Sequence, residues 1–158
     1  MNLIYKRAAV EDLELLTKTR IEVLKAANKL PGDIDMREVQ KHTCDYYRKA
    51  LCDGTHIAYF VWDENRFAGC GGVSFFQVMP TYRNPSGKKA YIMNMYTAPA
   101  YRRRGIAYKT LEMLVRDAKR RGITAISLEA TAMGRPLYEK YGFRNMKDEM
   151  ELPEQDPL

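Results

Sequence analysis

A run of three arginines followed by small residues is the first feature of this sequence that could carry chemistry. Residues 102–107 read Arg-Arg-Arg-Gly-Ile-Ala, and an amphipathic helix is expected to begin here. A helix start exposes backbone NH groups without an intrahelical partner, and it carries a partial positive charge. Gly105 and Ala107 would let a phosphate approach the main chain, and arginines would add charge-assisted hydrogen bonds. The run predicts a phosphate site, although a solvated basic loop has the same composition.

Strands and helices alternate around this run. The expected strands are residues 3–6, 57–62, 67–79, 90–97, 125–130 and 144–152, and the expected helices are residues 13–27, 35–52, 105–121 and 134–141. Strands 90–97 and 125–130 flank a helix, so they should run parallel, and ligands favour the carboxyl ends of such strands. The sequence therefore predicts an α/β fold with a mixed central sheet and flanking helices.

The length and composition limit the class of protein. A chain of 158 residues suits a single domain, here residues 1–158. The longest apolar runs, such as residues 57–62, are far shorter than the roughly 20 residues of a membrane span, and Lys6 and Arg7 come too early for a secretory signal. Three cysteines without a CxxC pair indicate free thiols, and two histidines without nearby ligands predict no metal site. We expect a cytoplasmic protein without a membrane partner.

The formal charge of +6 indicates an anionic partner, which could be nucleic acid, an acidic surface or a phosphorylated cofactor. The arginines lack the interleaved aromatic residues of a single-strand platform, so we expect no nucleic acid. Residues 69–72, Gly-Cys-Gly-Gly, could suggest a nucleotide loop, but they lack the lysine and serine of a P-loop. Close packing or a bulge within a strand explains these glycines better.

Two motifs in the expected order resemble those of a known family. The pattern Arg-x-x-Gly-x-Ala at residues 102–107 directly follows a strand that ends in Thr-x-Pro at residues 97–99. It resembles the acyl-CoA-binding motif of the GNAT superfamily of N-acyltransferases. Residues 137–143, Leu-Tyr-Glu-Lys-Tyr-Gly-Phe, resemble the family's C-terminal Leu-Tyr-x-x-x-Gly-Phe segment, and residues 7–12 resemble its usual opening. Thr131 departs from the family, since many members have asparagine there.

The resemblance implies a GNAT-like fold in which strands 90–97 and 125–130 splay apart. The gap would admit the pantetheine arm of acetyl-CoA, the expected co-substrate, and this arm would be lined by Met95, Tyr96 and Thr97. The diphosphate would be held by the segment of Arg102, Arg103, Arg104, Gly105, Ile106, Ala107 and Tyr108.

Acyl transfer to an amine needs an oxyanion donor, a proton for the departing thiolate and a group that deprotonates the amine. The resemblance implies that the backbone NH of Met95 is the oxyanion donor. It also implies that Tyr138 contacts the cofactor as the general acid. A phenol of pKa about 10 is a weaker acid than a thiol of about 8.5, so Tyr138 would mainly hydrogen-bond the sulfur. The alternative is a packed Tyr138 ring with its hydroxyl in solvent; Tyr141 is expected to be structural.

The group that deprotonates the amine is a separate question. Many relatives carry a glutamate on the splayed strand, but residues 90–97 contain no carboxylate and offer only Asn94 at a comparable place. Glu129 is the first candidate, because strand alternation puts it on the face opposite the apolar side chains of its strand. An exposed, inert glutamate is the alternative, and His42 and Glu22 are further candidates.

These features predict an N-acetyltransferase that moves acetyl from acetyl-CoA to a primary amine of a small molecule or peptide by direct attack on the thioester. The alternative is a non-catalytic acyl-CoA-binding sensor or subunit on the same fold, which the missing strand carboxylate leaves open. Residues 30–50 and 80–89 would shape the acceptor site, and they match no known pattern. A basic chain disfavours polycationic acceptors. Assembly as a homodimer stays open.

Overall fold

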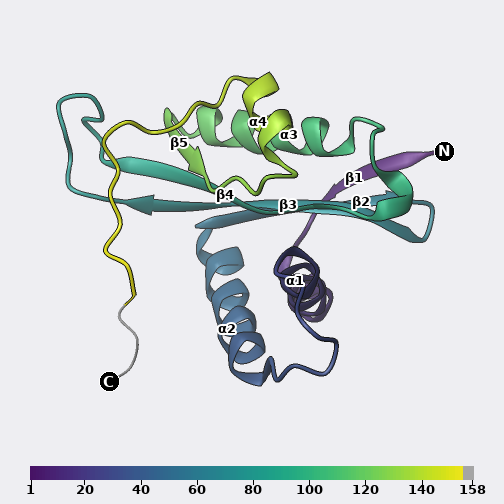
Figure 1. Ribbon diagram of the computed structural model, residues 1–158. Helices are drawn as coiled ribbons and strands as arrows, with labels where there is room; N and C mark the ends of the chain where they lie inside the picture. Colours follow the sequence, from purple (N-terminus) through teal and green to yellow (C-terminus); the bar gives the residue numbers. More distant parts are fainter. Residues whose placement is uncertain (155–158) are drawn as a thin grey trace.

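The computed structural model describes residues 1–154, in which one sheet carries helices on both faces (Figure 1). The strands are β1 (Leu3–Arg7), β2 (His56–Asp63), β3 (Arg66–Gln77), β4 (Lys88–Thr97) and β5 (Ala125–Leu128). The helices are α1 (Leu13–Ala27), α2 (Arg37–Asp53), α3 (Ile106–Arg120) and α4 (Arg135–Tyr141), and two 3-10 turns lie at Val10–Asp12 and Pro99–Tyr101. None of the helices within these residues is both long and apolar enough to cross a membrane.

The strands lie in the order β1-β2-β3-β4-β5. Neighbours are antiparallel except β4 and β5, which are parallel because α3 connects them. Helices α1 and α2 cover one face of the sheet, and α3 and α4 lie on the other (Figure 1). The prediction of a mixed sheet with a parallel pair is confirmed.

Each face of the sheet has its own core. On α3, Leu111, Leu114 and Ala118 recur at helical spacing and are fully buried against Ile92 of β4. The core under α1 and α2 contains Leu16, Val23, Tyr47 and Phe60. Burial of each large apolar side chain contributes about 1.5–3 kcal/mol, so both helix layers are held firmly on the sheet that carries the site.

The prediction of a closing strand over residues 144–152 is wrong. This segment has no strand structure, and its apolar side chains are not covered: Met150 is 96% exposed and Leu152 is 91% exposed. The charged residues 147–149 interrupt the apolar alternation, so the segment has no continuous apolar face to bury. Within residues 1–154, the outer edge of β5 is consequently unpaired.

Candidate functional site

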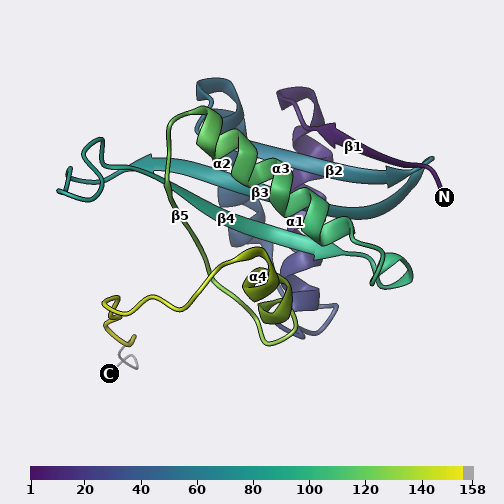
Figure 2. The same cartoon turned by 90° about the horizontal axis from the view of Figure 1, so that it is seen from above.

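Strands β4 and β5 are paired along only part of β4. Their hydrogen bonds join Lys89–Ile92 to Ala125–Leu128 and end there, while β4 continues to Thr97. Beyond β5 the chain turns toward α4, and Figure 2 shows the two segments diverging. On the side of β5, the edge of Met93–Thr97 therefore has no strand partner within residues 1–154. The predicted splay of the two strands is confirmed, and we call the divergence of β4 and β5 beyond Ile92 and Leu128 the opening.

A β-bulge in β4 lies at the start of the opening. The β3–β4 register shifts so that Asn94 and Met95 together face the single residue Gly71. Asn94 has a φ of 59°, a left-handed conformation that asparagine adopts more readily than most residues. The Arg20 guanidinium on α1 donates to Asn94 Oδ1 at 3.1 Å. The bulge lets Met95 pack against the core under α3, whereas Met93 and Asn94 face α1 and α2.

Asn94→Val should lower the free energy of unfolding by about 2 kcal/mol, because a branched side chain is strained in the left-handed region and the hydrogen bond to Arg20 is lost. Asn94→Asp is the matched control, since aspartate tolerates this conformation and can still accept from Arg20. Urea unfolding measures both variants. Equal stability of the two would show that the backbone at Asn94 is not strained.

The glycines of β3 mark close approaches to its neighbours. A Cβ at Gly69 would lie 2.7 Å from the Tyr96 carbonyl oxygen, and a Cβ at Gly72 would lie 2.7 Å from His56 Nε2. Both contacts are shorter than any normal carbon contact, so only glycine fits without a shift. The interpretation of this segment as close packing beside a bulge, rather than a nucleotide loop, is confirmed.

The basic run after β4 forms the turn that begins α3. Arg103 (φ 62°) and Gly105 (φ 79°) both adopt left-handed backbone, and α3 starts at Ile106. Among the described residues, no side chain caps this helix start, so its first NH groups are free for another acceptor. Arg102 Nε donates to the Thr97 carbonyl at 3.3 Å, which ties the run to the end of β4.

The remaining members of the predicted phosphate segment differ in exposure. Arg103 is exposed, and Arg104 lies 5.7 Å from the centre of a neighbouring tyrosine ring. Ala107 and Tyr108 are half-buried in the first turn of α3. The Ile106 side chain is buried in the core, so only its backbone NH could reach a phosphate. The run therefore offers two kinds of donor, the exposed arginine side chains and the backbone NH groups of the helix start.

Tyr138 lies on α4 with its ring buried against the core under α3. The ring meets Phe143 at a centroid distance of 6.2 Å, and burial raises the pKa of the phenol. A Cβ at Gly134 would lie 3.0 Å from the ring, so a glycine at the start of α4 gives the ring its room. Met95 and Ala130 pack against the same apolar cluster, on the face of the sheet that carries α3 and α4.

Glu129 directly follows β5 and is exposed. Ile126 and Leu128 pack against the core under α3, so strand alternation places Glu129 on the face of α1 and α2. Burial raises the pKa of the Tyr91 hydroxyl, and the nearby Glu129 carboxylate raises it further. Glu129 and Tyr138 therefore lie on opposite faces of the sheet.

A pocket of about 510 Å³ lies on the face of α1 and α2, next to the bulge. Its lining includes Arg20, His42, Tyr46, His56, Ser74 and Asn94. The Tyr46 hydroxyl lies 2.7 Å from His56 Nδ1 and 2.6 Å from Ser74 Oγ. Burial, and to a smaller extent the charge of Arg20, lowers the pKa of His56 to about 4, so this imidazole is neutral at pH 7.

Sequence reasoning found only part of this pocket. His42 lines it, whereas Glu22 does not. Arg20, Tyr46 and His56 were not predicted, although the side chains of α2 that line the pocket recur at spacings of three and four residues. This spacing indicates that the side chains share one face of α2, but it does not predict which strands that face contacts. Within residues 1–154, no three His, Cys, Asp or Glu side chains gather to hold a metal ion.

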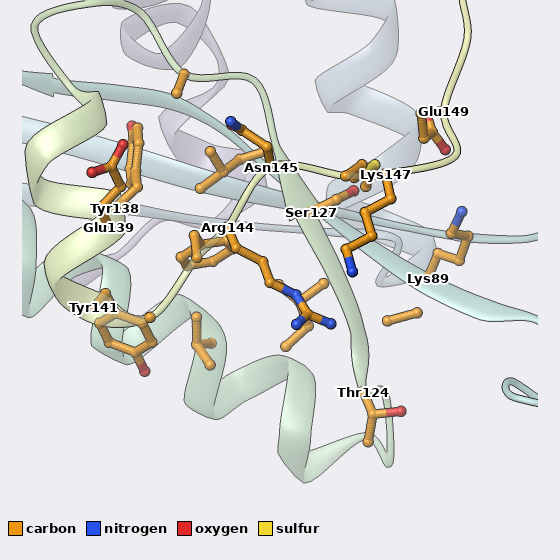
Figure 3. A pocket seen from close by; sticks show the side chains of 18 of the residues that line it. Lys89, Thr124, Ser127, Tyr138, Glu139, Tyr141, Arg144, Asn145, Lys147 and Glu149 are labelled. Carbon is orange, nitrogen blue, oxygen red and sulfur yellow. The ribbon is translucent and has the colours of Figure 1, made fainter.

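A larger cavity of about 1590 Å³ lies outside β5, between this strand, α4 and residues 144–149 (Figure 3). The side chains of Arg144 and Lys147 extend over β5 in this view, and Lys89 also lines the space. No residue of Arg102–Tyr108 lines it, so it is separate from the basic run. It occupies the side of β5 where the expected closing strand would have paired.

Comparisons with known proteins agree with this geometry. Residues 22–143 match the acetyltransferase (GNAT) family. A predicted acetyltransferase from Clostridium acetobutylicum, crystallised with acetyl-CoA, is 34% identical with a TM-score of 0.87, and 96% of each chain is covered. A GCN5-related N-acetyltransferase from Ralstonia eutropha JMP134 is 26% identical with a TM-score of 0.81, over 96% of this chain and 98% of that one. The uncharacterized N-acetyltransferase YsnE of Bacillus subtilis (strain 168) is 28% identical over 97 residues, and the match spans only 58% of its length.

The family match begins within α1 and ends just after α4, so it contains the opening, the start of α3 and the segment that carries Tyr138. The predicted acetyltransferase from Clostridium acetobutylicum has the same fold along 96% of this chain. This chain therefore belongs to the GNAT family of acetyltransferases.

Proposed function

We propose that this chain transfers the acetyl group of acetyl-CoA to a primary amine. The observation that carries the proposal is the opening, which leaves an unpaired strand edge between the uncapped start of α3 and the pocket on the other face. A thioester at the bulge would lie where an amine in the pocket can reach it. The relative from Clostridium acetobutylicum that was crystallised with acetyl-CoA supports this choice of co-substrate.

Main-chain groups would hold acetyl-CoA along this path. Backbone NH groups of residues 103–108 donate to the diphosphate, and the free edge at Met95–Thr97 hydrogen-bonds the pantetheine arm. The NH of Met95, next to the bulge, donates to the oxygen of the thioester carbonyl. Donors fixed by the fold stabilise the charge that develops on this oxygen without any reorganisation.

The acceptor reacts from the face of α1 and α2. Its ammonium, with a pKa of about 10.4, first loses a proton to solvent or to Glu129, which lies on that face. The amine nitrogen then forms a bond to the thioester carbon, and the carbon–sulfur bond breaks. The nitrogen releases its second proton to solvent. The sulfur departs as a thiolate that accepts a hydrogen bond from Tyr138 and then takes up a proton from solvent.

Thiol release from acetyl-CoA with a panel of amines, amino acids and peptides tests this function, together with calorimetry of CoA binding. We expect CoA to bind and at least one class of amine to accelerate thiol release. Failure of CoA to bind would overturn the proposal. Binding of CoA without turnover of any amine would instead support a non-catalytic acyl-CoA-binding module.

A further inference from the structure

The guanidinium of Arg20 carries a charge that no described side chain neutralises. It is half-buried and lines the pocket, and its hydrogen bond to Asn94 Oδ1 is to an uncharged amide. The salt bridges within residues 1–154 do not include Arg20, although Glu38 lines the same pocket. A partly desolvated charge without a counter-charge is costly for the protein, and it is suited to pair with a ligand.

Charged and polar residues other than Arg20 also line the pocket, and one of them is the acidic Glu38. No other lysine or arginine lines the pocket. The cluster of Tyr46, His56 and Ser74 is neutral, because the imidazole is buried and cannot protonate at pH 7. Among the described residues that line it, the pocket therefore has one fixed positive charge, which lies beside the bulge.

We infer, building on the proposed acetyl transfer, that the acceptor is a primary amine with an adjacent carboxylate, of the α-amino-acid class, and that Arg20 binds its carboxylate. A guanidinium matches a carboxylate with two parallel hydrogen bonds. Arg20 is bonded to Asn94, the neighbour of Met95, whose NH would bind the thioester oxygen. In an α-amino acid, a single carbon separates the amine from the carboxylate group. A carboxylate bound to Arg20 therefore holds the amine close to the thioester.

The rest of the pocket favours a neutral side chain on this amino acid. Val39, Tyr47 and Met93 contribute apolar surface, and a volume of about 510 Å³ admits a large side chain. Ser74 Oγ now donates to the Met93 sulfur at 3.6 Å, a weak acceptor, so it can donate to a polar ligand atom instead. Polyamines and aminoglycosides are disfavoured at the Arg20 end of the pocket, because this guanidinium repels added positive charge.

The test uses pairs of acceptors that differ by the carboxylate alone, within a panel of all free amino acids. L-Phenylalanine is compared with 2-phenylethylamine, and L-leucine with 3-methylbutylamine, while spermidine and a tripeptide represent the other classes. We expect kcat/KM for the preferred amino acid to exceed that of its decarboxylated partner by about 30-fold, the range of a hydrogen-bonded ion pair.

The variant Arg20→Gln should bring this ratio close to one, mainly by raising KM for the amino acid. Loss of the bond to Asn94 could disturb the bulge, but such damage lowers the rates of both acceptors and leaves their ratio unchanged. Arg116→Gln is the matched control, because it removes the same charge from an exposed position on α3. Its ratio should equal that of the wild type.

An equal kcat/KM for both members of every pair would overturn the inference, as would a ratio that Arg20→Gln leaves intact. Turnover of spermidine or the tripeptide with no free amino acid accepted would overturn it as well. In each of these cases acetyl transfer to an amine still stands. If no amine of any kind is acetylated, the proposed function fails and the inference fails with it.

Discussion

A chain with phenylalanine in place of Tyr138 should turn over about 100-fold more slowly than the wild type, with nearly unchanged affinity for acetyl-CoA. The ring is buried, so phenylalanine fills the same space and only the hydroxyl is lost. Because burial raises the pKa of this phenol, full proton transfer to a thiolate is uphill. In the proposed reaction the hydroxyl donates a hydrogen bond to the departing sulfur, so its removal should lower kcat. Steady-state kinetics and calorimetry separate the two effects.

Tyr141→Phe is the matched control, since Tyr141 lies on the same helix and packs among Tyr108 and Phe143. Its kcat should stay close to that of the wild type. The raised pKa of Tyr138 also fixes the pH dependence: the phenol stays protonated below its ordinary value of about 10, so its ionisation should cause no loss of kcat between neutral pH and that value. Similar losses in both variants would mean that removing either hydroxyl disturbs α4 in a general way and that the Tyr138 hydroxyl has no specific part in the reaction.

An aspartate at position 107 should weaken acetyl-CoA binding by at least about 100-fold while the chain stays folded. Ala107 lies in the first turn of α3, so the new carboxylate would occupy the free NH groups and repel the diphosphate. The same carboxylate interacts favourably with the helix dipole, and the fold should therefore keep its stability. Calorimetry of CoA binding and thermal unfolding measure the two effects.

Arg116→Gln serves again as the control, because it changes the charge by the same amount in the middle of α3. Its affinity for acetyl-CoA should remain near that of the wild type. If Ala107→Asp binds acetyl-CoA as tightly as the wild type does, the diphosphate does not bind at the start of α3. The assignment of this helix start, made from the sequence, would then have to be abandoned.

The parts of the site that the sequence could predict are those encoded by neighbouring residues. In the run before α3, Gly105 indicates by its residue type that the backbone can adopt the left-handed conformation at the helix start. The helix between β4 and β5 predicts that these two strands are parallel. The face of the sheet on which Glu129 lies followed from the alternation of side chains along β5. Each of these inferences needed only a short stretch of chain and a known periodicity.

The pocket could not be predicted because its residues come from distant segments. Arg20 on α1 meets Asn94 on β4, and Tyr46 on α2 meets Ser74 on β3. No local pattern encodes such contacts, which depend on how the helices pack on the sheet. The strand predicted at residues 144–152 failed for a related reason: strand propensity does not create a partner, and a strand needs one to form.

The end of pairing between Ile92 and Leu128 also has a kinetic consequence. Because the strands part there in the folded chain, a pantetheine arm that binds as proposed would enter without breaking a sheet hydrogen bond. The free energy needed to keep the strands apart is already part of the free energy of folding. It therefore adds no barrier to ligand entry. Association should then be governed by diffusion and by the positive charge near α3, so that added salt slows capture of the anionic ligand. The lifetime of the complex would set how quickly one molecule of acetyl-CoA replaces another.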